Sequence, residues 1–129
     1  MRKRLPHILV VASRTAFRRV FDYLEASGKY RLDYAPEGGL ARRFLEERTP
    51  DTVLLELPSE KQAAERTLGW LDGVKQKTVV VMISAHKDMH FYLAAMERGA
   101  FDYFTRHTPL EEITRVLDNA VRGHRRQAA

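Results

Sequence analysis

The sequence predicts an α/β fold in which a parallel sheet is covered by helices on both faces. Continuous apolar runs, typical of strands buried on both faces, alternate with segments whose apolar residues recur at helical spacing. This alternation repeats five times in a chain of 129 residues, which is the length of one domain. A hydrophobic content of 44% is enough for one sizeable core.

The first half of the chain contains two strand and helix pairs. Residues 7–12 form a continuous apolar run that predicts a strand, and the apolar stripe over 17–24 predicts a helix. Gly28 is placed to end that helix. Residues 30–35 alternate polar and apolar side chains like a strand, and a second helical stripe follows over 40–45.

The third and fourth pairs occupy the middle of the chain. Residues 52–57 are the third predicted strand, and Ser59-Glu60-Lys61-Gln62 has the form of a capping box that begins a helix. Residues 78–83 predict the fourth strand, and a helix is expected from about 87 to 98.

The fifth pair ends the domain. Residues 101–105 can form a short strand. Thr108-Pro109-Leu110-Glu111 then combines an N-cap threonine, a proline at the first helical position and a capping glutamate. We therefore expect one domain over 7–122, flanked by an N-terminal tail (1–6) and a C-terminal tail (123–129).

The formal charge of +5 comes mainly from the two ends of the chain. Six of the 22 Lys and Arg residues lie in the terminal segments, which leaves 16 basic residues against 17 acidic ones in the body. Basic tails of this kind are more often solvated than specific for nucleic acid. A nucleic-acid-associated accessory protein, which would bind through these tails, is the alternative from another functional class. The six residues are Arg2, Lys3, Arg4, Arg122, Arg125 and Arg126.

The composition also excludes several kinds of chemistry. The chain has no cysteine, which excludes disulfides, thiolate catalysis and cysteine-ligated metals, and which fits a reducing compartment. No apolar stretch approaches the roughly 20 residues that span a bilayer. We expect a cytoplasmic protein with no membrane partner.

Polar side chains follow the predicted strands at the points where these strands end. Ser13, Glu56, Ser84 and Arg106 all occupy such positions. In open parallel sheets, ligands bind outside the carboxyl ends of the strands. This edge is therefore the predicted functional site.

The order of these motifs resembles the receiver domain of bacterial response regulators, which act in two-component phosphorelay signal transduction. The resemblance covers about residues 7–122. It implies a flavodoxin-like (βα)5 three-layer sandwich with strand order 2-1-3-4-5. The motifs that carry it are Ile8-Leu9-Val10-Val11, Val53-Leu54-Leu55-Glu56-Leu57-Pro58, Met82-Ile83-Ser84-Ala85-His86 and Gly99-Ala100-Phe101-Asp102-Tyr103-Phe104-Thr105-Arg106.

The resemblance implies that the phosphoacceptor site is degenerate. In an active receiver an aspartate accepts the phosphoryl group, and two acidic residues after the first strand hold Mg²⁺. Here Glu56 stands at the acceptor position, and Ala12 and Ser13 replace the acidic pair. Because Mg²⁺ requires oxygen ligands in a tight octahedron, we expect its binding to be weak or absent, and we expect no catalytic residue or metal site.

Three further positions of the resemblance form a switch region. Ser84 keeps the family's hydroxyl, Arg106 replaces its lysine, and Tyr103 is the switch aromatic. The guanidinium fork of Arg106 suits bidentate pairing with a carboxylate. We therefore expect Glu56 to pair with Arg106, with Ser84 drawn in and Tyr103 rotated inward, unless the pair only fills a vacated pocket.

The resulting prediction is a pseudo-receiver that signals through protein contacts and is not an enzyme. Its partners would be a signalling protein or an output domain, and a homodimer would form through the fourth helix, fifth strand and fifth helix. The alternative within the family is a receiver with weak residual phosphoryl acceptance. A hydrolase built from Ser84, His86 and Glu56 is disfavoured because no Gly-x-Ser-x-Gly elbow is present, and His86 with His90 lacks a third metal ligand.

Overall fold

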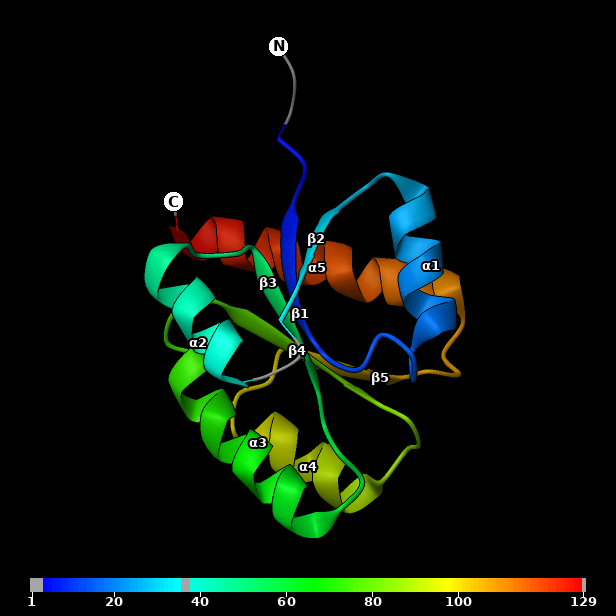
Figure 1. The fold of residues 1–129 in the computed structure, drawn as a ribbon, viewed down its shortest axis with the longest axis vertical. Helices are drawn as coiled ribbons and strands as arrows, with labels where there is room; N and C mark the ends of the chain where they lie inside the picture. The colour runs from blue at the N-terminus through cyan, green and yellow to red at the C-terminus, as the bar shows by residue number, and fades with distance from the viewer. Residues whose placement is uncertain (1–3, 36–37, 129) are drawn as a thin grey trace.

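The computed structural model describes residues 4–35 and 38–128, and within them strands and helices alternate along the chain (Figure 1). The elements are β1 (His7–Val11), α1 (Arg18–Ser27), β2 (Arg31–Tyr34), α2 (Gly38–Glu47), β3 (Thr52–Glu56), α3 (Lys61–Val74), β4 (Val79–Ser84), α4 (Met89–Glu97), β5 (Asp102–Thr105) and α5 (Leu110–Ala128). Each predicted strand and helix is present, with bounds shifted by a few residues.

The strands form one parallel sheet in the order β2-β1-β3-β4-β5, which confirms the predicted fold class and strand order. One row of paired residues crosses the whole sheet: Tyr34, Val10, Leu54, Val81 and Asp102. The chain starts at β1 in the middle of the sheet, adds β2 on one side, and then adds β3, β4 and β5 on the other side. The carboxyl ends of β1 and β3 therefore lie side by side.

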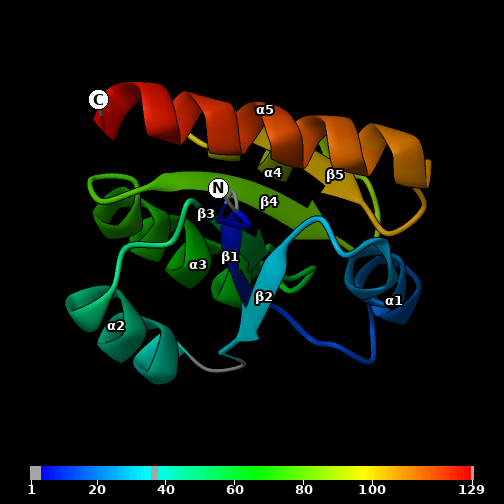
Figure 2. The same ribbon diagram turned by 90° about the horizontal axis from the view of Figure 1, so that it is seen from above.

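Two apolar layers fill the space between the sheet and the helices (Figure 2). On one face Val10 and Leu54 pack with α1 and α5, where Phe21 and Leu117 are buried. On the other face Leu9 packs with residues of α2, α3 and α4. Because successive strand residues point to opposite faces, a strand buried on both faces needs the continuous apolar runs that the sequence contains.

The start of α3 differs from the predicted capping box. Glu60, not Ser59, is the N-cap, and its carboxylate accepts hydrogen bonds from the N–H groups of Gln62 (3.0 Å) and Ala63 (2.8 Å). These bonds hold the pKa of Glu60 below its ordinary value. A carboxylate satisfies two unpaired N–H groups at once and complements the positive end of the helix, which a serine hydroxyl does less well.

The last helix also begins and ends differently from the prediction. It begins at Leu110, and the Thr108 hydroxyl accepts a hydrogen bond from the Thr105 N–H (3.1 Å), so it holds the preceding turn. It continues to Ala128 and thus includes residues 123–128, which we expected to begin a tail. Of the expected N-terminal tail, residues 1–3 lie outside the described residues.

Within 4–35 and 38–128, no helix has the length and apolar character needed to cross a membrane.

Candidate functional site at the carboxyl edge of the sheet

The predicted site residues gather where β1, β3, β4 and β5 end. Ala12 and Ser13 follow β1, Glu56 is the last residue of β3, Ser84 is the last residue of β4, and Arg106 follows β5. Since the strands are parallel, all of these ends lie at one edge of the sheet.

The carboxylate of Glu56 is held by the main chain of the neighbouring loop. Its Oε1 accepts a hydrogen bond from the Ser13 N–H at 2.9 Å. Glu56 is partly exposed and lines a cavity of about 460 Å³ together with Ala12 and Trp70. Arg66 of α3 also lines this cavity, which therefore presents one carboxylate and one guanidinium group beside a methyl group and an indole.

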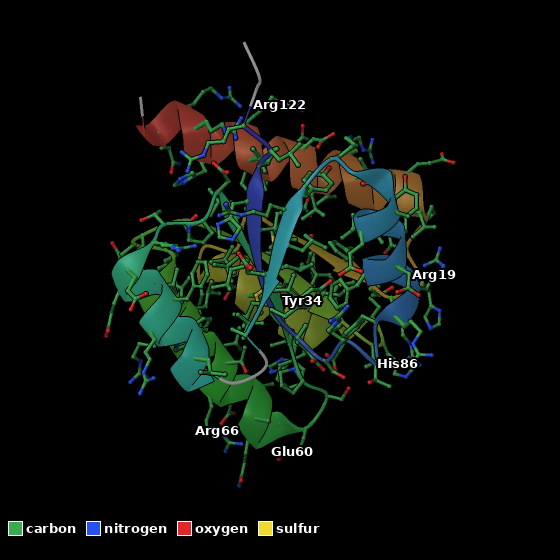
Figure 3. The ribbon with its side chains drawn as sticks, turned by 45° about the horizontal axis from the view of Figure 1, so that its top comes forward. Arg19, Tyr34, Glu60, Arg66, His86 and Arg122 are labelled. Carbon is green, nitrogen blue, oxygen red and sulfur yellow. The ribbon has the colours of Figure 1, made fainter. Side chains whose placement is uncertain are left out.

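The predicted ion pair between Glu56 and Arg106 is wrong, since none forms between these two described residues. The Arg106 Nε instead donates to His107 Nε2 at 3.4 Å. The Arg106 carbonyl accepts a hydrogen bond from Nη1 of Arg19 (labelled in Figure 3) at 2.8 Å, which ties the loop after β5 to α1. The Glu56 carboxylate is hydrogen bonded to the backbone N–H of Ser13, which is nearer than Arg106. The Arg106 side chain contacts His107 in its own loop.

Ser84 and Tyr103 contact one another, and the Glu56 carboxylate takes no part in this contact. The Ser84 hydroxyl donates to the His86 carbonyl at 2.7 Å and is hydrogen bonded to the Tyr103 hydroxyl. The Tyr103 hydroxyl also lies 3.3 Å from the His86 carbonyl. Tyr103 is only partly exposed and stacks edge-on against Tyr92, with ring centroids 5.3 Å apart. The Tyr103 hydroxyl is thus turned toward Ser84.

A second, smaller cavity of about 200 Å³ opens beside this pair. Ser84, His86, Phe91 and Tyr103 are among its lining residues. His86 (labelled in Figure 3) stacks obliquely with His107, with ring centroids 6.1 Å apart. Sequence reasoning missed Arg19 as a part of this edge, and it missed the contacts of His107 with His86 and Arg106, because neither side chain matches a motif.

The residues at this edge do not fit a magnesium ion. Ala12 has no side-chain donor, and the Ser13 hydroxyl accepts a hydrogen bond from the Ala16 N–H at 3.2 Å within the loop. Across the described part of the chain, no group of three or more His, Asp or Glu side chains is arranged to hold a metal. Among Ala12, Ser13 and Glu56, only Glu56 has an anionic oxygen, whereas Mg²⁺ needs several oxygen ligands.

The nearest aspartate in the sequence, Asp51, lies at the opposite edge of the sheet. It precedes β3, accepts a hydrogen bond from the His7 N–H at 2.8 Å and pairs with Arg125 at 3.2 Å. Burial opposes ionisation of Asp51, but the His7 N–H and Arg125 outweigh it and hold the pKa of Asp51 below its ordinary value. Asp51 therefore cannot replace Glu56 at the carboxyl edge.

Apolar side chains are exposed on α4 and just before β5. Met89 and Leu93 are 53% and 50% exposed on α4, and Phe101 is 40% exposed. Phe91 and Met96 are partly buried against the core. The exposed side chains are those that a partner of this face would contact.

Comparisons with known proteins agree with the fold and the motifs. The family model described as the response regulator receiver domain matches residues 8–118. The chain is 25% identical over 104 residues to the transcriptional regulatory protein YdfI of Bacillus subtilis (strain 168), which is 78% of this chain and 47% of YdfI. It is 23% identical over 114 residues to the regulatory protein AtoC of Escherichia coli (strain K12), which is 88% of this chain and 25% of AtoC.

Solved structures show the same fold. A response regulator from Thermotoga maritima matches with a TM-score of 0.74 and 23% identity, over 89% of this chain and 99% of that one. The signal receiver domain of the response regulator NarL from Mycobacterium tuberculosis matches with a TM-score of 0.75 and 21% identity, over 94% and 99%. The chain thus spans one complete receiver fold, but less than half the length of YdfI or AtoC.

Proposed function

Because this chain belongs to the response regulator receiver domain family, we propose that it is a pseudo-receiver, which signals through protein contacts without phosphorylation of an aspartate. The observation that carries the proposal is the environment of Glu56. Within 4–35 and 38–128, the one hydrogen-bond partner of its carboxylate is the Ser13 N–H, and Ala12 and Ser13 supply no carboxylate beside it.

The chemistry of phosphoryl transfer supports this proposal. Transfer depends on positioning and on cations that offset the charge of the phosphoryl group. A Mg²⁺ ion would supply most of the positive charge that offsets the phosphoryl group. A site with one carboxylate, and without a second and third, would not hold this ion. The domain would then form and break no covalent bond of its own, and would act in the cytoplasm by binding a signalling protein or an output domain.

The contact between Ser84 and Tyr103 supports a fixed signalling state. In a two-state domain, a contact that forms in only one of the two states biases the equilibrium toward that state. Here the tyrosine hydroxyl is hydrogen bonded to the serine, while the Glu56 carboxylate accepts a hydrogen bond from the loop after β1. The proposed signal is therefore the presence and concentration of the protein, and not its phosphorylation.

Magnesium binding tests this proposal through the single tryptophan of the chain. Trp70 lines the same cavity as Glu56, so its fluorescence reports on ions bound there. We expect no saturable change with millimolar Mg²⁺ in the natural chain, and a saturable change in the Ala12→Asp/Ser13→Asp variant. Saturable quenching of the natural chain that Glu56→Gln abolishes would instead favour a receiver with residual phosphoryl acceptance.

A further inference from the structure

A strongly basic cavity lies at the amino edge of the sheet, opposite the Glu56 site. Its volume is about 700 Å³, within the usual size range of small-molecule sites. Both described ends of the chain lie at this end of the molecule (Figure 1). The lining includes four arginines from four separate segments: Arg4 before β1, Arg31 at the start of β2, Arg48 after α2 and Arg125 on the last turns of α5.

Three of these arginines are oriented by neighbouring side chains. Arg125 Nε lies 3.2 Å from Asp51 Oδ1, and Arg31 Nε lies 3.9 Å from Asp33 Oδ2. The Arg48 guanidinium stands over the Phe44 ring, 5.9 Å from its centroid. Each contact uses one side of the guanidinium group, so other N–H groups of the fork are available to a ligand.

The wall between the arginines is built around His7. Its side chain is 9% exposed, and its Nε2 lies 2.6 Å from Asp33 Oδ2. Burial lowers the pKa of His7 below 6.5, so the ring is neutral at pH 7. His7 therefore acts as a rigid support and not as a fifth cation.

Positive charge is in excess at this cavity. Four guanidinium groups face two carboxylates, those of Asp51 and Asp33. The carboxyl ends of α2 and α5 add about half a negative charge each. An excess of cationic character remains, and an anionic ligand would neutralise it.

We propose that this cavity binds a compact ligand that carries two or more phosphate groups. Guanidinium forks bind phosphate oxygens in pairs, and several converging arginines match adjacent phosphates better than a single carboxylate. The arginines surround a concave space, whereas a nucleic-acid backbone is bound by cations spread along a surface. Arg4 and Arg125 belong to the segments that the sequence alone assigned to solvated tails.

Calorimetric titration with inorganic pyrophosphate and with ATP, at physiological salt, tests the proposal. We expect both to bind one site and to compete with each other. The exposed pair Arg31→Gln/Arg48→Gln should weaken binding by about tenfold or more, because charge-assisted hydrogen bonds are lost. The control pair Arg18→Gln/Arg43→Gln removes the same charge from exposed residues outside the cavity and should keep the natural affinity.

Two further measurements keep the outcome interpretable. Thermal unfolding followed by circular dichroism verifies that each variant is folded, and Arg48→Lys, which keeps the charge but loses the fork, should bind with intermediate affinity. Absence of binding to both probes, or equal losses in the cavity pair and the control pair, would overturn the site. Displacement of ATP by a short DNA duplex, with the same dependence on Arg31 and Arg48, would overturn the assignment to a compact ligand.

Discussion

At the scale of single residues, the carboxyl edge is organised by contacts with the main chain. Glu56 accepts from the Ser13 N–H, and Ser84 donates to the His86 carbonyl. These bonds to the main chain orient both side chains. Tyr103 extends this arrangement because its hydroxyl reaches both Ser84 and the His86 carbonyl.

The bond between Ser84 and Tyr103 can be measured with a double-mutant cycle. We expect Tyr103→Phe to lower the free energy of unfolding by about 1 kcal/mol, the usual net value of a hydrogen bond. Ser84→Ala should cost more, since the bond to His86 is lost as well. If the two hydroxyls interact, the double variant costs less than the sum of the single ones. Strict additivity in denaturant unfolding would contradict the contact.

The buried His7 ring makes stability depend on pH. Burial lowers the folded-state pKa of His7 below 6.5, although the bond with Asp33 opposes this shift. Below pH 6.5 the unfolded chain takes up a proton that the folded chain does not. The stability that the neutral His7 ring contributes should therefore be fully present above pH 6.5. It should be lost as the pH falls from 6.5 through the folded-state pKa, so the free energy of unfolding decreases over this range.

Urea unfolding at several pH values checks this dependence. His7→Gln, which does not titrate, should flatten the curve between pH 6.5 and the acid range. Asp51 contributes stability that is lost only as the pH falls from 3.8 through its lowered folded-state pKa, so it does not produce a slope near neutrality. A slope near neutrality that persists in His7→Gln would contradict the role of His7.

At the scale of elements, the helices differ in how their ends and interiors are specified. α1 ends at Gly28, whose φ of 66° lies in the left-handed region that favours glycine. The interior of α3 contains Gly69 and Gly73, and a methyl group added at either would meet open space. Glycine inside a helix is destabilising relative to alanine, so these two positions weaken α3.

Alanine substitution separates the two kinds of glycine. We expect Gly73→Ala to raise the free energy of unfolding by about 0.5–1 kcal/mol, because it removes backbone freedom without a clash. The matched substitution Gly28→Ala should lower stability by a similar amount, since alanine is strained at positive φ. Thermal unfolding of the two variants distinguishes these effects, and a destabilised Gly73→Ala would contradict the open surface at α3.

At the scale of the whole molecule, the periodicity of apolar residues in the sequence was sufficient to predict the parallel sheet and the helices that cover it. Buried strands and amphipathic helices repeat with characteristic periods, and parallel strands bring their ends to one edge. Two features depended on tertiary distances that no periodicity contains. The Ser13 N–H lies closer to Glu56 than Arg106 does, and the two basic ends of the chain meet around one cavity.

We propose that two copies of the chain form a homodimer through the surface of α4, β5 and α5. We expect light scattering to show a larger mass at high concentration, and Leu93→Glu to reduce it, because a charge on this apolar face must be desolvated. Leu40→Glu is the control, since Leu40 is 48% exposed on α2 and Leu93 is 50% exposed on α4. A monomer at every concentration would exclude the homodimer.

Phosphorylation is the most direct test of the degenerate acceptor site. The intact mass of the chain is measured after incubation with a small phosphodonor and Mg²⁺, beside an Ala12→Asp/Ser13→Asp/Glu56→Asp variant that restores three carboxylates. We expect the natural chain to keep its mass and the variant to gain one phosphoryl group. A phosphoryl group on the natural chain that Glu56→Gln removes would contradict the pseudo-receiver proposal.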